Sequence, residues 1–169
     1  GMTEGNFPEF APLTTIQLLE EYGALMEELR RRKIVRSSNN PLSDYAELLF
    51  CTAFTWSRKG NSEAGCDAID AQGIRYQIKA RRLTPHNGSR QLSAIRKLDS
   101  KPFDFLAGLL VDARFAILKA VIVPCSVVVK RSVHVAHTNS WKFMLQDEVW
   151  SLPSCRDVTA ELRAAAAKL

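Results

Sequence analysis

The chain lacks any apolar run long enough to suggest a membrane span. Its longest apolar stretches, residues 103–111 and 115–123, are strand-sized and interrupted, whereas a spanning helix needs about 18 or more apolar residues. The N-terminus has no basic region followed by an apolar block, so it does not resemble a secretory signal. We therefore expect a cytoplasmic protein with no membrane partner.

Cysteine is sparse and lacks the spacing of a disulfide framework or a zinc site. The four cysteines stand at positions 51, 66, 125 and 155, and no two of them form a C-x-x-C pair. Buried free thiols are the expected outcome for such a pattern. His134 and His137 are three residues apart, but no neighbouring cysteine or carboxylate completes a zinc set.

The chain also lacks internal repeats and any segment with the composition of a linker. Its 169 residues, of which 46% are hydrophobic and 24% are charged, suit one globular domain with its own core. We expect a single domain over residues 1–169.

Positive charge is concentrated in one segment of the chain. Residues 75–101 contain a single acid and eight basic residues, which are Arg75, Lys79, Arg81, Arg82, Arg90, Arg96, Lys97 and Lys101. The rest of the chain holds 15 basic and 17 acidic residues, so the positive excess of the whole chain, +5, lies in this segment. Such a stripe on a nearly neutral body is typical of a surface that binds a phosphate backbone, and a solvated helix face is the alternative.

Apolar periodicity predicts a mixed α/β domain with a central sheet. The expected helices are 14–33, a second one from Ser43 or Asp44 to about Phe54, 90–98, a short one after Pro124, and 156–169. The expected strands are 55–57, a hairpin within 66–82, 104–111 and 115–123.

The second helix begins with a pattern that has two interpretations. Asp44 and Glu47 are three residues apart and stand just ahead of the apolar run 48–50, as the two acceptors of a capping box do. The capping box accounts for Glu47 by itself, and a role as a metal ligand is the alternative.

Residues 66–82 carry the most informative pattern. From Ile74 to Arg81 apolar and polar residues alternate strictly, which predicts a strand with one apolar and one polar side. Asp70 and Gly73 occupy the first and fourth positions of the preceding turn, as in a hairpin with a three-residue loop.

The register of this hairpin decides which acid meets the polar side. A loop at residues 71–73 pairs Asp67 with Gln77 and places both on the side of Lys79. A two-residue loop would slip the register and bring Asp70 to that side instead. We favour Asp67, because Asp70 already has a structural role in the turn.

An Asp followed about ten residues later by a metal-binding side chain, any residue and Lys resembles the signature of the PD-(D/E)XK nuclease superfamily. Here it stands as Asp67 … Gln77-Ile78-Lys79. Restriction enzymes, Holliday-junction resolvases and Mrr-like nucleases belong to this superfamily. The resemblance covers residues 44–111 and implies a restriction endonuclease-like core, flanked here by the N-terminal helix 14–33 and the C-terminal helix 156–169.

Two residues depart from the usual form of this motif. Cys66 stands where the proline would be, and Gln77 replaces the acid, as in the Q-x-K version of the Mrr-like branch. An amide oxygen can ligate a hard cation but adds no charge, so the affinity for metal should be lower. An active and a degenerate site both remain open on this pattern.

The resemblance implies a metal-dependent phosphodiester hydrolase, most of all a DNA endonuclease, with Mg²⁺ or Mn²⁺ as its cofactor. Asp67, Gln77 and Lys79 would be the catalytic residues, and Asp67, Gln77 and Glu47 would hold the metal. Lys79 would orient or activate the attacking water and offset charge at the scissile phosphate.

The expected partner is nucleic acid, in the first place double-stranded DNA. Arg81, Arg82 and Arg90 are the predicted contacts to its phosphates. A homodimer is a further expectation, because cutting both strands of a duplex usually needs two sites. Two other readings stay open: a catalytically inert nucleic-acid-binding module of the same fold, and a protein-interaction domain.

Overall fold

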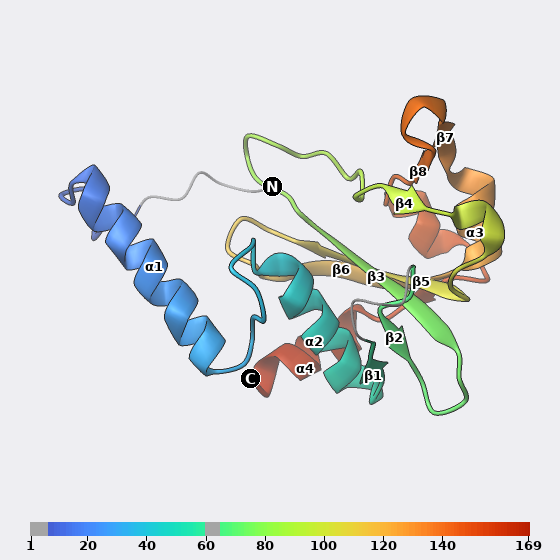
Figure 1. Ribbon diagram of the computed structural model, residues 1–169, viewed down its shortest axis with the longest axis horizontal. Helices are drawn as coiled ribbons and strands as arrows, with labels where there is room; N and C mark the ends of the chain where they lie inside the picture. The colour runs from blue at the N-terminus through green and yellow to red at the C-terminus, as the bar shows by residue number, and fades with distance from the viewer. Residues whose placement is uncertain (1–6, 60–64) are drawn as a thin grey trace.

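A six-stranded mixed sheet forms the centre of the fold, in the order β1-β2-β3-β5-β6-β9 (Figure 1). The computed structural model describes residues 7–59 and 65–169, and all counts refer to these. The strands of this sheet are β1 Ser57–Arg58, β2 Ala68–Ile69, β3 Arg75–Arg82, β5 Phe105–Val111, β6 Ile117–Pro124 and β9 Arg156–Asp157. Strand β3 is parallel to β5, and the other neighbouring pairs are antiparallel. The predicted mixed α/β class is confirmed.

The remaining elements lie around this sheet. The helices are α1 Thr15–Arg31, α2 Leu42–Phe54, α3 Cys125–Arg131 and α4 Thr159–Ala167. A small antiparallel sheet has the order β4-β8-β7, with β4 Ile95–Arg96, β7 Val133–Val135 and β8 Ser140–Lys142. Three short 3₁₀ turns span Leu98–Ser100, Ala136–Thr138 and Asp147–Ser151. Within the described ranges, no helix combines the length and the apolar character that crossing a membrane requires.

Two apolar cores lie on opposite sides of the central sheet. Because side chains alternate along a strand, neighbours on β5 belong to different cores: Leu109 packs with α2 and α4, and Leu110 packs with α3 and the small sheet. Both leucines are fully buried. The sheet is thus covered on both faces, and only its edges and strand ends can carry polar groups toward solvent.

The predicted hairpin is confirmed with its predicted register. Strands β2 and β3 pair Ala68 with Tyr76, and the amide of Asp70 donates to the carbonyl of Ile74 at 3.0 Å. Gly73 adopts a left-handed conformation, φ +82°, and its amide donates to the Asp70 carbonyl. The Asp70 carboxylate also accepts the amides of Gln72 and Ile74. These local bonds fix the turn, and the turn fixes which side chains of β2 and β3 share a side.

The predicted helix at 90–98 is wrong. Its backbone pairs with neighbouring strands instead: the amide of Leu92 donates to the Phe143 carbonyl, and Ile95 pairs with Trp141 in the small sheet. Leu92, Ile95 and Leu98 are buried at intervals of three residues. That interval imitates a helical stripe, but here it arises because an extended segment and a 3₁₀ turn cover one core.

Two helix starts also differ from the prediction. Helix α2 begins at Leu42, with Pro41 at the cap position, and no side chain makes a capping hydrogen bond there. Asp44 and Glu47 therefore form no capping box. At the other end, 156–157 form strand β9 against β6, and α4 begins only at Thr159.

The hairpin turn gives a test of this fold. Gly73 and Gly88 both have open space where a Cβ would be added, but only Gly73 has a left-handed φ. Gly73→Ala should therefore lower the free energy of unfolding by about 1 kcal/mol, because a Cβ is strained in that conformation. Gly88→Ala should change it by less than about 0.5 kcal/mol. Urea unfolding of the two variants measures the difference, and equal effects would contradict the assigned turn.

Candidate functional site

The carboxylate of Asp67 lies against the outer edge of β3. Strand β2 pairs with β3 only at Arg75 and Tyr76, and beyond that point β3 has no strand partner on this side. Beyond this point one oxygen of Asp67 accepts hydrogen bonds from the backbone amide of Ile78 and from the side-chain amide of Gln77, both at 2.7 Å. A carboxylate is thus fixed at the place where the hairpin ladder ends.

Lys79 lies on the same side of β3 as Gln77, two residues further on. Its ammonium group donates to the hydroxyl of Ser93 at 2.7 Å and to the carbonyl of Ala94 at 3.2 Å. The segment that was expected to be a helix therefore supplies both anchors of this lysine.

Burial moves the pKa values of this pair toward the neutral forms. It raises the pKa of Asp67, and the negative charge of Glu47 acts in the same direction, while the Ile78 amide and Lys79 oppose it. It also lowers the pKa of Lys79, against the attraction of Asp67. A half-buried acid and amine with pKa values moved toward each other are typical of functional sites, although structural ion pairs can share this property.

Glu47 lies on α2, where two arginines hold its carboxylate. Its carboxylate accepts from Arg36 at 2.9 Å and from Arg58 at 2.8 Å, and Arg58 also lies 3.6 Å from Asp44. The side chains of Arg58, Asp44 and Glu47 are each no more than 20% exposed. Ion pairing, and not helix capping, explains why Glu47 is turned toward the β1 and β2 end of the sheet.

The oxygen atoms of Asp67, Glu47 and Gln77 can be compared with the ligands that a hard cation needs. Among the side chains of residues 7–59 and 65–169, no group of three or more His, Cys, Asp and Glu residues is placed to hold a metal ion. Asp67 and Glu47 provide two carboxylates. The amide oxygen of Gln77 is the third ligand that the motif implies, but the nitrogen of this amide, and not its oxygen, faces Asp67. For these residues to hold a metal, the Gln77 amide would have to turn over, a change that the two-fold shape of an amide permits.

The basic side chains of residues 75–101 do not all lie on the same surface. Arg75 is paired with Asp104, and Arg90 is paired with Asp147. Arg81 follows Lys79 on the same side of β3 and donates to the Gln91 carbonyl. Arg82 points to the opposite side, where it donates to the Ala113 carbonyl and lies over the ring of Phe115. The three predicted phosphate contacts therefore do not lie on one face.

The sequence pattern missed the residues that position the candidate site. Arg36 and Arg58 contact Glu47 across eleven residues of chain in either direction, and Ser93 contacts Lys79 across fourteen. These are tertiary contacts between loops and elements, and no local spacing in the sequence indicates them.

Comparisons with known proteins do not assign the chain to a family. No protein-family model matches the chain, and no curated protein matches it.

Burial of Asp67 predicts that its charge costs stability. A raised pKa means that the folded state prefers the protonated carboxyl, so the penalty is full above the raised pKa and disappears as the pH falls from there to the ordinary pKa of an aspartate. Asp67→Asn keeps an oxygen for the two amides and removes the charge. Its melting temperature should exceed that of the wild type at neutral pH, and the two should converge as the pH falls through the pKa of Asp67.

Asp104→Asn is the matched control with the opposite sign. Arg75 lowers the pKa of Asp104, so this charge stabilises the fold at neutral pH and the contribution is lost as the pH falls through the lowered pKa. The variant should therefore melt below the wild type at neutral pH. Thermal unfolding across a pH series measures both changes, and a loss of stability in Asp67→Asn equal to that in Asp104→Asn would contradict the account.

Proposed function

We propose that the chain is a Mg²⁺- or Mn²⁺-dependent endonuclease of the PD-(D/E)XK type that acts on DNA. The observation that carries the proposal is the position of the Asp67 carboxylate, which contacts Gln77 directly and interacts electrostatically with both Glu47 and Lys79. In this proposal all four motif residues would contribute to one half-buried site at the open edge of β3.

Each residue has a distinct task in this proposal. Asp67, Glu47 and the oxygen of Gln77 would hold the cation, which on binding would polarise the scissile phosphate and acidify a bound water. Lys79 would offset the negative charge that develops on the phosphate. Because Ser93 and the Ala94 carbonyl already orient its ammonium group, little freedom is lost when a phosphate binds.

Cationic side chains near Lys79 would bind the nucleic-acid backbone. Arg81 lies on the same side of β3 and forms no ion pair with any described residue. The positive charge of Arg96 lowers the pKa of Lys79. Arg82 contributes on the opposite side, and Arg90 contributes least because Asp147 already offsets its charge. A homodimer belongs to the proposal, since two such sites would cut the two strands of a duplex.

A catalytically inert nucleic-acid-binding module is the second candidate function. Two observations favour it: Gln77 turns its nitrogen toward Asp67, and Glu47 is already bound by Arg36 and Arg58. In that reading the carboxylates are satisfied within the protein, and a cation would have to displace these partners.

Substitution of Gln77 separates the two candidates. Gln77→Glu adds one negative charge and the commoner ligand, so Mg²⁺ should bind about tenfold more tightly or better if this side chain touches the metal. Gln72→Glu, the same change at the exposed tip of the hairpin, should leave the affinity unchanged. Isothermal titration calorimetry measures both, and a wild type and a Gln77→Glu variant that bind neither Mg²⁺ nor Mn²⁺ at millimolar levels would contradict the enzyme.

Lys79→Ala tests the chemistry itself. Nicking of plasmid and of branched DNA should be lost while the circular dichroism spectrum is retained, because the side chain of Lys79 makes two hydrogen bonds to described residues, both in one loop. Lys130→Ala, on the exposed side of α3, is the control and should cut normally. DNA binding that weakens with salt in a wild type without any cleavage would instead identify the inert module.

A further inference from the structure

Acidic residues are absent from the two stretches of chain that build the small sheet. Residues 71–98 and 113–146 contain 12 basic residues and no acid, so the rest of the chain holds 11 basic residues and all 18 acidic ones. Four of the basic side chains form no ion pair with a described residue and come from β3, β4 and β8. We call them the basic track, which consists of Lys79, Arg81, Arg96 and Lys142.

The small sheet directs its part of the basic track away from the protein core. Arg96 pairs with Ser140 of β8, and Lys142 stands two residues further along that strand, so both lie on one side of the sheet. Ile95 and Trp141 pair on the opposite side and pack into the core that this sheet covers. The side that carries the two charges is therefore the outer side of the small sheet.

The basic track begins at the candidate site. Lys79 donates to Ser93 and Ala94, and the two residues that follow Ala94 form β4. Burial lowers the pKa of Lys79, and the positive charge of Arg96 acts in the same direction. A phosphate backbone that lies at Lys79 can therefore continue over β4 toward β8 without leaving the basic track.

Beyond β8 lies a hairpin turn with a fixed shape. Its four residues, 136–139, are all exposed, and Figure 1 shows the turn at the margin of the molecule. The backbone amide of Asn139 closes the 3₁₀ turn with a hydrogen bond of 3.1 Å. The side-chain oxygen of Asn139 lies 3.0 Å from Nε2 of His134, whose ring packs against Trp141 with 4.6 Å between the centroids. The side chain of His137 forms no hydrogen bond with a described residue.

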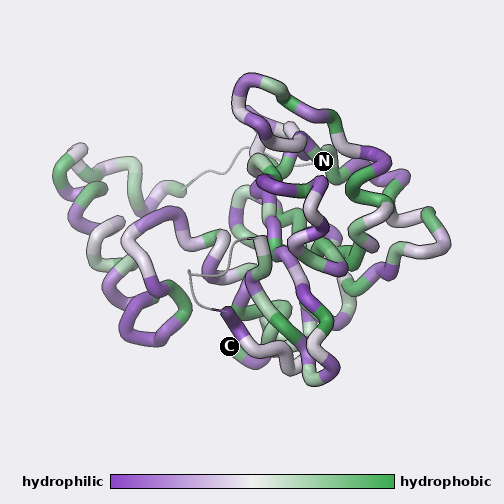
Figure 2. Tube along the Cα trace, turned by 45° about the vertical axis from the view of Figure 1, so that its right-hand side comes forward, coloured by the Kyte–Doolittle hydropathy of each residue, from purple (hydrophilic) through white to green (hydrophobic). Residues whose placement is uncertain are grey.

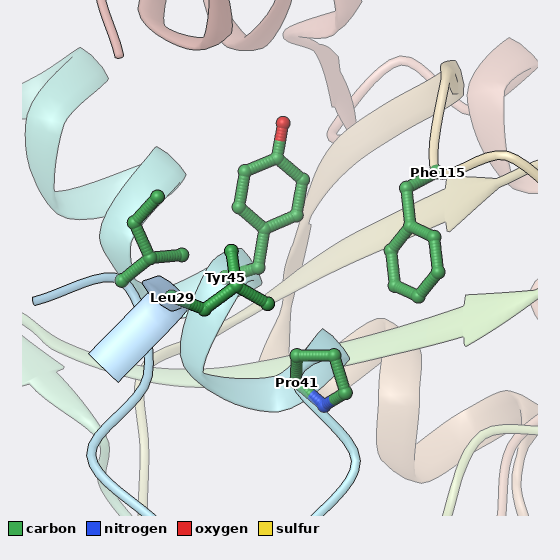
Figure 3. A pocket seen from close by; sticks show the side chains of 5 residues that line it. Leu29, Pro41, Tyr45 and Phe115 are labelled. Carbon is green, nitrogen blue, oxygen red and sulfur yellow. The ribbon is translucent and has the colours of Figure 1, made fainter. Parts of the chain in front are cut away.

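The surfaces around α1 do not fit a polyanion. The run Arg30–Arg32 pairs with Glu27 and Glu28 of the same helix, and Figure 2 shows hydrophobic residues along α1. A cavity of about 270 Å³ between α1 and the body is lined by five residues, none of them charged, which are Leu29, Ile34, Pro41, Tyr45 and Phe115. Figure 3 shows Phe115 across the opening from Leu29 and Tyr45. A phosphate backbone would meet neutralised charge or apolar surface there.

We propose that the basic track and the β7–β8 hairpin bind one DNA duplex, which extends from the candidate site over the small sheet. A two-stranded hairpin fits the major groove of DNA, which is about 12 Å wide, and the turn would bring His137 to the base edges. Arg96 and Lys142 would contact the phosphates beside that groove. The choice of DNA rests on the proposed function, whereas the surface itself rests on its charge and shape.

The first experiment removes charge from the basic track in the full chain. Arg96→Ala with Lys142→Ala should weaken binding of a labelled duplex about tenfold or more, and it should lower the slope of log affinity against log salt by about two. Lys33→Ala with Lys168→Ala removes the same charge from exposed positions after α1 and at the end of α4, and should change neither quantity. Fluorescence anisotropy in EDTA, which prevents metal-dependent cleavage, measures both pairs. Equal effects of the two pairs would overturn the proposal.

The second experiment tests the hairpin. His137→Glu puts a negative charge at the turn and should weaken duplex binding about tenfold or more. Gln72→Glu places the same side chain in the exposed turn of the β2–β3 hairpin and should have little effect. Methylation of guanine N7, which lies in the major groove, should weaken binding by the wild type, and a minor-groove ligand should not compete. Full affinity of His137→Glu, or competition by the minor-groove ligand, would overturn the assigned groove contact.

Binding by this surface and cleavage at the candidate site can fail independently. If the wild type nicks plasmid with Mg²⁺ while Arg96→Ala with Lys142→Ala binds the duplex as tightly as the wild type, the surface is wrong and the nuclease stands. If the wild type binds the duplex through the basic track and cuts with neither Mg²⁺ nor Mn²⁺, the nuclease is wrong and the surface stands. A wild type that binds single-stranded DNA or anionic lipid vesicles but no duplex would overturn the surface.

Discussion

The bond from the backbone amide of Ile78 to the carboxylate of Asp67 is the contact on which the candidate site depends. Strand β2 ends after two paired residues, and an edge amide of β3 would then lack a partner. The carboxylate replaces the missing strand, as buried backbone donors require. The same oxygen accepts a hydrogen bond from the side-chain amide of Gln77. One acceptor therefore ends the hairpin ladder and also holds Gln77 next to Asp67.

This arrangement places stability and function in opposition. Burial raises the pKa of Asp67 and lowers that of Lys79, so the fold favours neutral forms where the proposed chemistry needs charged ones. Glu47 adds a second negative charge, and the fold offsets it with Arg36 and Arg58. In the proposed enzyme, a bound cation would offset the repulsion between the two carboxylates that remains.

Local patterns predicted what local forces determine. The turn at 70–74 follows from Asp and Gly at fixed positions, and the register of the hairpin follows from the turn, so the convergence of Asp67 and Gln77 could be read from the sequence. The segment 90–98 could not, because its three-residue spacing of apolar residues fits a helix and is produced here by pairing with β8 and its neighbours. The partners of Glu47 and Lys79 were equally hidden, since each is contributed by a distant loop or strand.

The central claim is that a divalent cation binds beside Asp67, and the most direct test locates that cation. Substoichiometric Mn²⁺ added to ¹⁵N-labelled protein broadens the resonances of nearby groups. The account predicts that the backbone amide of Ile78 and the side-chain amide of Gln77 broaden first, that excess Mg²⁺ reverses the effect, and that Asp67→Asn removes it. Broadening centred elsewhere, or unchanged in Asp67→Asn, would contradict the account.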